Sequence, residues 1–313
     1  MRRMCQWYLK FENHLTLALA SMPPRLASTH LRVDVGGVPA IDGLTFATTG
    51  DHVLVLGAAR ALFEAAAGMR PISRGELRVE GMAAPQAIRA GIVACAPLDP
   101  LLPAEWTVFQ YATWSARLAG HERATASALA TDALGRMQIE PMNKAKLGAA
   151  SLAVKRAVVL AAALATGAGT LLVEDPTAGL SGEAAHLLAR ATVRALDDRL
   201  TAMFAARVPL ESPLALGADE AIVVDGSQVT VQGAPAEVAA AEGTLALRVQ
   251  GNVDAFQRAV QAQGGRARVA TGAPPPVHVR VELGPLIARD LLRIAAESDA
   301  TVVELRPLGR PFA

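Results

Sequence analysis

The sequence predicts an α/β protein with a largely parallel core sheet, followed by a small α+β domain. Three observations support this fold class. Short apolar segments alternate with helical segments over about 200 residues, as in a parallel sheet covered by helices. The pattern then changes near Gly243. The chain has 313 residues, 52% of them hydrophobic, which is enough for about two domains with apolar cores.

The first domain is expected to alternate strands and helices. Residues 30–46 read as strand, turn and strand, with Gly36 and Gly37 at the turn. The apolar run 51–56 predicts a buried strand before Gly57. A helix over 58–67 is expected to end at Gly68. Further strands are expected at 76–79, 91–96, 170–173, 201–205 and 221–224, and further helices at 107–118, 122–137, 151–165 and 182–197.

The segment after Gly243 predicts a second, smaller domain. Strands are expected at 245–250, 266–270, 277–283 and 301–305, and helices at 253–263 and 286–297, with Pro285 at a first helical position. This β-α-β-β-α-β order is that of a ferredoxin-like unit. We expect three regions: an N-terminal extension over 1–28, a first domain over 29–242 and a second over 243–313. For the extension, disorder and a true start at Met22 both remain open.

Composition excludes several classes of protein. Lys and Arg number 30 and Asp and Glu 29, and this balance argues against a nucleic-acid-binding protein. Cys5 and Cys95 cannot form a disulfide framework, so a reducing cytoplasm is expected. The uncharged stretch 157–173 is interrupted by 166–169 and predicts a buried helix, a turn and a buried strand rather than a membrane span. No signal peptide is expected either.

The most informative stretch is TLLVEDPTAGLS, residues 170–181. An apolar strand ends in two adjacent carboxylates, Glu174 and Asp175. Carboxylates at the carboxyl end of a parallel strand face the ligand crevice of an α/β sheet, where one can hold Mg²⁺ and the other orient a water. A solvated turn after a strand is the alternative interpretation.

EDPTAGLS resembles the Walker B and D-loop motifs of ABC-transporter ATP-binding subunits. The family's signature motif lies about twenty residues upstream, where this chain has Ala150–Arg156 before an Ala-rich helix. Four further segments look like the family's first hairpin, post-P-loop segment, Q-loop stretch and last strands: VGGVPAIDGLTF (35–46), GMRPISRGELRVEG (68–81), APLDPLLPAEWTV (96–108) and DEAIVVDGSQVTVQGAPAEV (219–238). The C-terminal unit, ending in ATVVELRP (300–307), resembles the tail domain of ABC-2-type subunits.

This resemblance implies a P-loop NTPase-like fold that binds ATP and Mg²⁺. It also implies a cytoplasmic subunit on the inner face of the cell membrane, bound to a permease and to a second ATPase subunit or another copy, with no nucleic acid involved. Ser151 would then touch the nucleotide of the partner subunit. Trp106 and Trp114, at helical spacing, are interpreted as packing residues. Because the family's segment after the Q-loop touches the permease, a docking face formed by Leu101, Leu102, Trp106, Phe109 and Tyr111 is the alternative.

The catalytic positions depart from the family pattern. A P-loop needs G-x-x-x-x-G-K-[ST], but here Gly57 leads into AARAL, about four residues short and without the Lys or the hydroxyl. Arg60 is the nearest cation and a weak candidate for a phosphate contact. Other family positions carry different residues. Val35 stands at the position of the aromatic residue that stacks on adenine, and Leu98 at that of the Q-loop glutamine. Leu152 and Ala153 stand where the signature motif has glycines, and Ser181 where the D-loop has aspartate. No switch histidine follows the strand at 201–205.

We interpret the chain as a degenerate ATP-binding subunit, a pseudo-ATPase. Glu174 stands where Asp would bind Mg²⁺, and Asp175 where Glu would act as the base. Two alternatives remain: an ATP-binding enzyme with slow hydrolysis that uses Arg60, Glu174 and Asp175, and a scaffold or regulator outside transport. Ser151 has a simpler role available as a helix N-cap.

Overall fold

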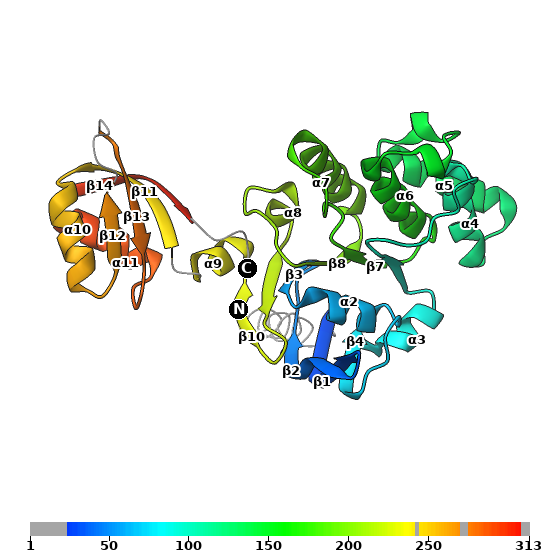
Figure 1. Ribbon diagram of the computed structural model, residues 1–313, viewed down its shortest axis with the longest axis horizontal. Helices are drawn as coiled ribbons and strands as arrows, with labels where there is room; N and C mark the ends of the chain where they lie inside the picture. Colours follow the sequence, from blue (N-terminus) through cyan, green and yellow to red (C-terminus); the bar gives the residue numbers. More distant parts are fainter. Residues whose placement is uncertain (1–23, 242–243, 270–274, 308–313) are drawn as a thin grey trace, which may run out of the picture.

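A computed structural model describes residues 24–241, 244–269 and 275–307 (Figure 1). The strands of this part of the chain form three sheets, in the orders β2-β1-β4-β5, β10-β9-β3-β8-β7-β6 and β12-β13-β11-β14. The predicted extension, residues 1–28, lies mostly outside the described residues. Its last residues do not: β1 begins at Leu26, so Leu26, Ala27 and Ser28 belong to the first sheet.

The first sheet is antiparallel. It contains β1 (Leu26–Val35), β2 (Val38–Ala47), β4 (Arg74–Val79) and β5 (Met82–Ala83). The predicted turn is confirmed, since Gly36 and Gly37 join β1 to β2 with φ values of +60° and +81°. Sequence reasoning missed the short β5.

The central sheet is parallel except at one edge. Its strands are β3 (His52–Gly57), β6 (Val93–Ala96), β7 (Thr170–Glu174), β8 (Leu200–Ala205), β9 (Glu220–Val224) and β10 (Val229–Gly233), of which β10 runs antiparallel to β9. Both faces of the sheet are covered, which explains why the strands are continuous apolar runs. Along β3, Val53 and Val55 pack toward α2, while Leu54 and Leu56 pack into the core of the larger helices.

The helices of this part are α2 (Ala59–Ala66), α3 (Ala84–Arg89), α4 (Val108–Leu118), α5 (Arg123–Arg136), α6 (Leu152–Ala165), α7 (Gly182–Leu196), α8 (Pro213–Leu216) and α9 (Pro235–Ala241), with 3-10 turns at Glu140–Met142 and Leu147–Ala149. Figure 1 shows α4, α5 and α6 grouped at one end of the molecule. The apolar stretch 157–173 is a buried helix, a turn and a buried strand, as predicted. No helix among the described residues is long and apolar enough to span a bilayer.

The C-terminal unit has its own sheet and core, at the opposite end of the molecule (Figure 1). Its elements follow the predicted order: β11 (Thr244–Gly251), α10 (Val253–Ala262), β12 (Arg266–Val269), β13 (Val277–Glu282), α11 (Ala288–Glu297) and β14 (Ala300–Pro307). The sheet is antiparallel throughout. The expectation that Pro285 begins a helix is wrong, because Pro285 lies in a turn and α11 begins at Ala288. The Asp290 carboxylate accepts the Ile287 N–H at 3.0 Å and sets this start.

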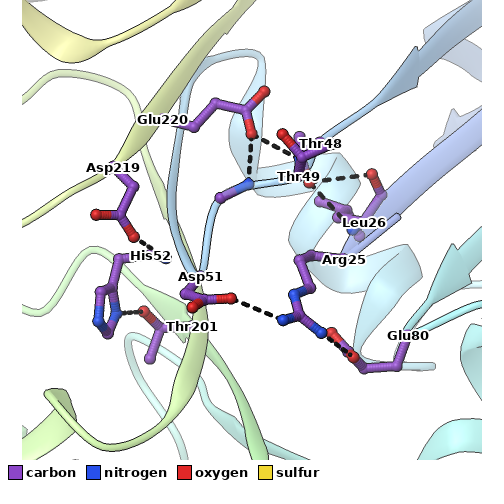
Figure 2. Close-up of polar contacts among 11 residues, drawn as sticks. Arg25, Leu26, Thr48, Thr49, Asp51, His52, Glu80, Thr201, Asp219 and Glu220 are labelled. Atoms are coloured by element: carbon purple, nitrogen blue, oxygen red, sulfur yellow. Dashed lines mark hydrogen bonds and ion pairs between the residues drawn. The ribbon is translucent and has the colours of Figure 1, made fainter. Parts of the chain in front are cut away.

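Polar contacts join several segments at the amino ends of the parallel strands (Figure 2). Glu220, at the start of β9, accepts the N–H groups of Thr49 and Gly50 at 2.7 and 2.8 Å through Oε2. Asp219 accepts the His52 N–H at 3.0 Å. These bonds fasten the connection between β2 and β3 to the start of β9.

Arg25 makes a second link at the same edge (Figure 2). Its guanidinium lies 2.7 Å from Asp51 and 3.0 Å from Glu80, which precede β3 and follow β4. Burial raises the pKa of the Glu80 carboxyl, and the charge of Arg25 opposes that rise. Arg25 therefore ties the antiparallel sheet to the parallel one.

Candidate functional site

The parallel strands of the central sheet all end at one edge, which is where open α/β sheets bind ligands. Gly57 ends β3 and Glu174 ends β7. Arg60, in the first turn of α2, reaches Glu174. Four of the predicted site residues, Gly57, Arg60, Glu174 and Asp175, therefore come together at this carboxyl edge.

A single residue, Ala58, joins β3 to α2. Gly57 has a φ of +86°, and a Cβ there would lie 2.2 Å from the Val224 carbonyl oxygen, so any side chain would clash. The Ala58 N–H donates to that same carbonyl at 2.8 Å. A phosphate-binding loop instead points several unbonded backbone N–H groups at one anion. At this junction the Ala58 N–H is already bonded to β9 and does not point at a possible anion.

Arg60 links two carboxylates. Its Nε lies 3.2 Å from Glu64 Oε1 and 3.7 Å from Glu174 Oε1. The hydrogen bond to Glu64, followed by the charge of Glu174, raises the pKa of Arg60. Glu64 also accepts a hydrogen bond from Arg70 at 2.6 Å. Sequence reasoning missed Glu64, although its position four residues after Arg60 on a helix was a usable signal.

Both carboxylate oxygens of Glu174 face groups of the protein. The residue is only 8% exposed. Its Oε2 accepts the Leu98 N–H at 2.9 Å, and its Oε1 faces the Arg60 guanidinium. Mg²⁺ requires nearly octahedral oxygen ligands. Because both oxygens of Glu174 are already occupied by the Leu98 N–H and the Arg60 guanidinium, the arrangement does not favour the predicted role of Glu174 as a Mg²⁺ ligand.

Asp175 has an unusual backbone conformation, with a φ of +24°. Its N–H donates to the Phe204 carbonyl at 2.8 Å, which continues the pairing of β7 with β8. Burial raises the pKa of its carboxyl, and a 3.4 Å hydrogen bond from Thr177 opposes that rise. A partly buried carboxyl of raised pKa in this position is a group that can take up a proton.

The loop after β6 is held from two sides. Glu174 of β7 accepts the Leu98 N–H, and Arg156 of α6 donates to Asp99 Oδ1 at 2.9 Å. The Arg156 side chain is 9% exposed, whereas that of its partner Asp99 is 73% exposed, so the pair lies at the surface end of a buried arginine. The partners are 76 and 57 residues apart in the chain, and no local sequence signal pointed to either contact.

Ser151 is the N-cap of α6. Its Oγ accepts the Val154 N–H at 3.4 Å, which is the simpler role anticipated for it. Leu152, the next residue, is 40% exposed and lies beside Gly179. Within the described ranges no hydrogen bond or ion pair joins Ser151 to the other predicted site residues. Ser151 is exposed and stands apart from the carboxyl-edge group.

Two hollows flank α6. A cleft of about 280 Å³ lies between α6 and the loop after β6 and is lined by Leu101, Leu102 and Arg156, among others. A groove of about 560 Å³ lies between β6, α4 and α6, with Tyr111 on its wall. Three of the five residues expected to form one docking face are thus divided between these hollows, and the other two, Trp106 and Phe109, line neither and pack partly buried against the core.

Known structures share the fold of most of this chain. No protein-family model matches the sequence, and no curated protein is significantly similar to it. A structure of cbiO1 from Clostridium perfringens, described as part of the ABC transporter complex cbiONQ, is 21% identical; the match covers 69% of this chain and 90% of that one, with a TM-score of 0.59. A nucleotide-free ATP-binding cassette from an ABC transporter is 16% identical, with coverages of 67% and 91% and a TM-score of 0.58.

A third structure, an ATP-binding cassette in its ADP conformation, is 16% identical, with coverages of 67% and 91% and a TM-score of 0.57. In each case the match spans about nine-tenths of the known protein. Over about two-thirds of its length, the chain therefore has the fold of the ATP-binding subunits of ABC transporters.

Proposed function

We propose that the chain is a degenerate ATP-binding subunit of an ABC-2-type transport complex. It pairs with an ATPase-competent subunit or a second copy and docks on a membrane permease from the cytoplasmic side. The domains are residues 29–242, extended at the start by the first residues of β1, and a ferredoxin-like unit over 243–313. The antiparallel order β12-β13-β11-β14 and the two helices of that unit support the second assignment.

The junction between β3 and α2 is the observation that carries the proposal. In the cassette fold, this junction is where ATP phosphates would bind. Here it is one residue long, and its Ala58 amide is bonded to Val224. The nearby cation, Arg60, is paired with Glu64 and Glu174 rather than left unpaired. These contacts support the proposal that ATP and Mg²⁺ binding is weak or absent.

The groove beside Tyr111 supports docking on a permease. It lies between the strand before the Leu98 loop and helices α4 and α6. Tyr111 of the groove wall also has aromatic neighbours outside the groove: Trp114 is 44% exposed, and its ring centroid lies 6.2 Å from that of Tyr111 and 5.6 Å from that of Trp106. Aromatic side chains of this kind are enriched at protein interfaces.

The acid pair supports a second candidate function, slow ATP hydrolysis by Arg60, Glu174 and Asp175. The raised pKa of Asp175 favours it, since a general base works best with a pKa near the working pH. If this function is correct, the isolated chain has ATPase activity that Asp175→Asn abolishes. Under our proposal the isolated chain hydrolyses no ATP above background, and the background rate is the same in the Asp175→Asn variant.

Calorimetric titration with Mg·ATP tests the proposal directly. We expect a dissociation constant weaker than about 1 mM, equivalent to no more than about 4 kcal/mol. A micromolar dissociation constant would overturn the proposal. Docking is tested separately by purifying the chain from its native membrane: a permease and an intact ATPase subunit are expected to co-purify, and their absence would favour a scaffold outside transport.

A further inference from the structure

One face of the C-terminal sheet carries a cluster of arginines. Residues alternate along each strand, and Leu247, Ala267 and Val279 point inward to the core formed with α10 and α11. Their neighbours point to the opposite face, which no helix of the unit covers. This surface, called here the arginine face, is formed by Arg248, Arg266, Arg268 and Arg280, with His278, Glu282 and Glu304 among them.

The strand register arranges this face in three rows across the sheet. In one outer row, Arg266 is opposite Glu282, with Nη1 and Oε2 3.9 Å apart. In the other outer row, Arg248 is opposite Glu304 and lies 3.6 Å from it. Each outer row therefore contains its own acid.

The central row contains no acid. Arg268 of β12 is directly opposite Arg280 of β13, Ala246 follows on β11, and the register places Arg306 of β14 at the far end of the row. Arg268 and Arg280 are exposed, and neither has an ion-pair partner among the described residues. Like charges directly opposite each other destabilise a sheet. A bound oxyanion would remove that repulsion, because two guanidinium groups can each offer it paired N–H donors.

The surroundings of the central row favour one kind of ligand. A continuous polyanion, such as nucleic acid or an anionic bilayer, would also meet the acids in both outer rows. The described part of this face has no Phe, Tyr or Trp on which bases could stack. A small metabolite needs a concave site that buries most of its surface, whereas this is the open face of a sheet. The remaining ligand is one that carries separate carboxylates and can lie on an open surface. Isolated carboxylates on the surface of a protein meet both conditions.

We propose that the arginine face binds an acidic segment of a partner protein, whose carboxylates pair with Arg268 and Arg280. The positive charge of the central row is complementary to such a segment. Because each outer row contains a glutamate, a run of contiguous acids would be repelled there, so the acids of the segment must be well separated. This surface is independent of the carboxyl-edge site and of whether the chain binds ATP.

Fluorescence anisotropy of the full chain with a labelled peptide tests the proposal. The peptide carries glutamate at alternate positions, and a second peptide carries glutamine in their place. At low ionic strength we expect the glutamate peptide to bind and the glutamine peptide to bind at least about tenfold more weakly. The double variant Arg268→Gln/Arg280→Gln should weaken glutamate-peptide binding at least about fivefold.

A matched double variant, Arg258→Gln/Arg289→Gln, removes the same charge from exposed positions on α10 and α11. It should change binding less than about twofold, and both variants should keep the wild-type melting temperature within a few degrees. Equal losses in the two variants would overturn the proposal, as would no binding of the glutamate peptide. A single-stranded oligonucleotide and phosphatidylserine vesicles are tested in the same way. If either binds more tightly than the glutamate peptide and this binding depends on Arg268, that ligand, and not an acidic segment, is the partner of the arginine face.

Discussion

The amino and carboxyl edges of the central sheet use their acidic residues differently. At the amino edge, one oxygen of Glu220 accepts two backbone N–H groups at 2.7 and 2.8 Å (Figure 2). At the carboxyl edge, Glu174 accepts a single N–H and faces a guanidinium 3.7 Å away. Asp175, beside it, has a raised pKa. Each edge contains one acid whose pKa burial raises, Asp175 at the carboxyl edge and Glu80 at the amino edge, but the acids of the amino edge mainly join separate segments of the fold.

This difference shows that a cluster of acids is not by itself a sign of a ligand site. The amino edge has four acidic residues in two separate sets of contacts, and both sets join segments of the fold. The carboxyl edge has two, in the position where this fold places its chemistry. The two edges differ in the groups that contact each carboxylate. Three of the four experiments below test this difference, and the fourth, on Ser151, examines a position outside both edges.

The largest effect is expected at the amino edge. Glu220→Ala leaves the Thr49 and Gly50 amides without their acceptor and removes the bond from Gln232. We expect a loss of about 2–3 kcal/mol of unfolding free energy, since hydrogen bonds to charged acceptors contribute about 1.5–3 kcal/mol each and this group is half-exposed. Urea unfolding measures the loss. Glu220→Gln keeps an acceptor and should lose less; an unchanged midpoint in the alanine variant would contradict the structural role.

At the carboxyl edge, Glu174→Ala should cost about 1–3 kcal/mol, because the Leu98 N–H loses its acceptor. Hydrogen exchange should also become faster at Leu98 and Asp99. Glu174→Gln retains an acceptor and is the control. Adding Mg²⁺ should leave the wild-type melting temperature unchanged. A Mg²⁺-dependent rise that disappears in Glu174→Ala would instead make this residue a metal ligand.

Ser151 tests a position away from both edges. Loss of an N-cap costs about 1 kcal/mol, so Ser151→Ala and Ser151→Arg should both lower the melting temperature slightly. If the α6 start also meets a partner subunit over its ATP, Ser151→Arg should weaken ATP-dependent association while Ser151→Ala weakens it little. Association that is unchanged in both variants, with a lower melting temperature, would leave Ser151 as a cap only.

The smallest effect concerns pH. The pKa of an aspartate in an unfolded chain is about 3.9. Burial raises the pKa of Asp175 above its ordinary value in the folded chain. The folded state therefore holds this proton more tightly, and the stability linked to it is lost as pH rises through the folded pKa. Asp175→Asn removes that loss. The melting temperature of the variant relative to wild type should thus be higher at about pH 7 than at about pH 4. A pH-independent difference would show that the carboxyl is not perturbed.

Local sequence patterns predicted most of the fold. The buried strands β3 and β7 and the Ala-rich helix α6 were found because their apolar runs are long and bounded by glycine. The short helix α3 was missed, because six residues give too little periodicity and its start, Ala84-Pro85, resembles a turn. Pro285 was misplaced for a related reason. Its ring suits a first helical turn, but the Asp290 contact that starts α11 lies further along the chain.

The candidate site was only partly predictable. Glu174 and Asp175 were found because they directly follow an apolar strand. The partners that decide the role of Glu174, the Leu98 amide and Arg60, come from two other parts of the chain and meet it only in the folded protein. The Arg156–Asp99 pair was missed for the same reason. Sequence patterns therefore predicted where the site lies better than what each of its groups contacts.

The tight turn at Gly57 also bears on how this lineage can evolve. Because one residue connects β3 to α2, and because a Cβ at Gly57 would lie 2.2 Å from the Val224 oxygen, point mutations cannot rebuild a phosphate-binding loop here. Building such a loop would require an in-frame insertion together with a shift of α2, whose Leu62 and Phe63 are fully buried. Each step toward it would therefore disturb the packing of α2 against the sheet before the loop was complete.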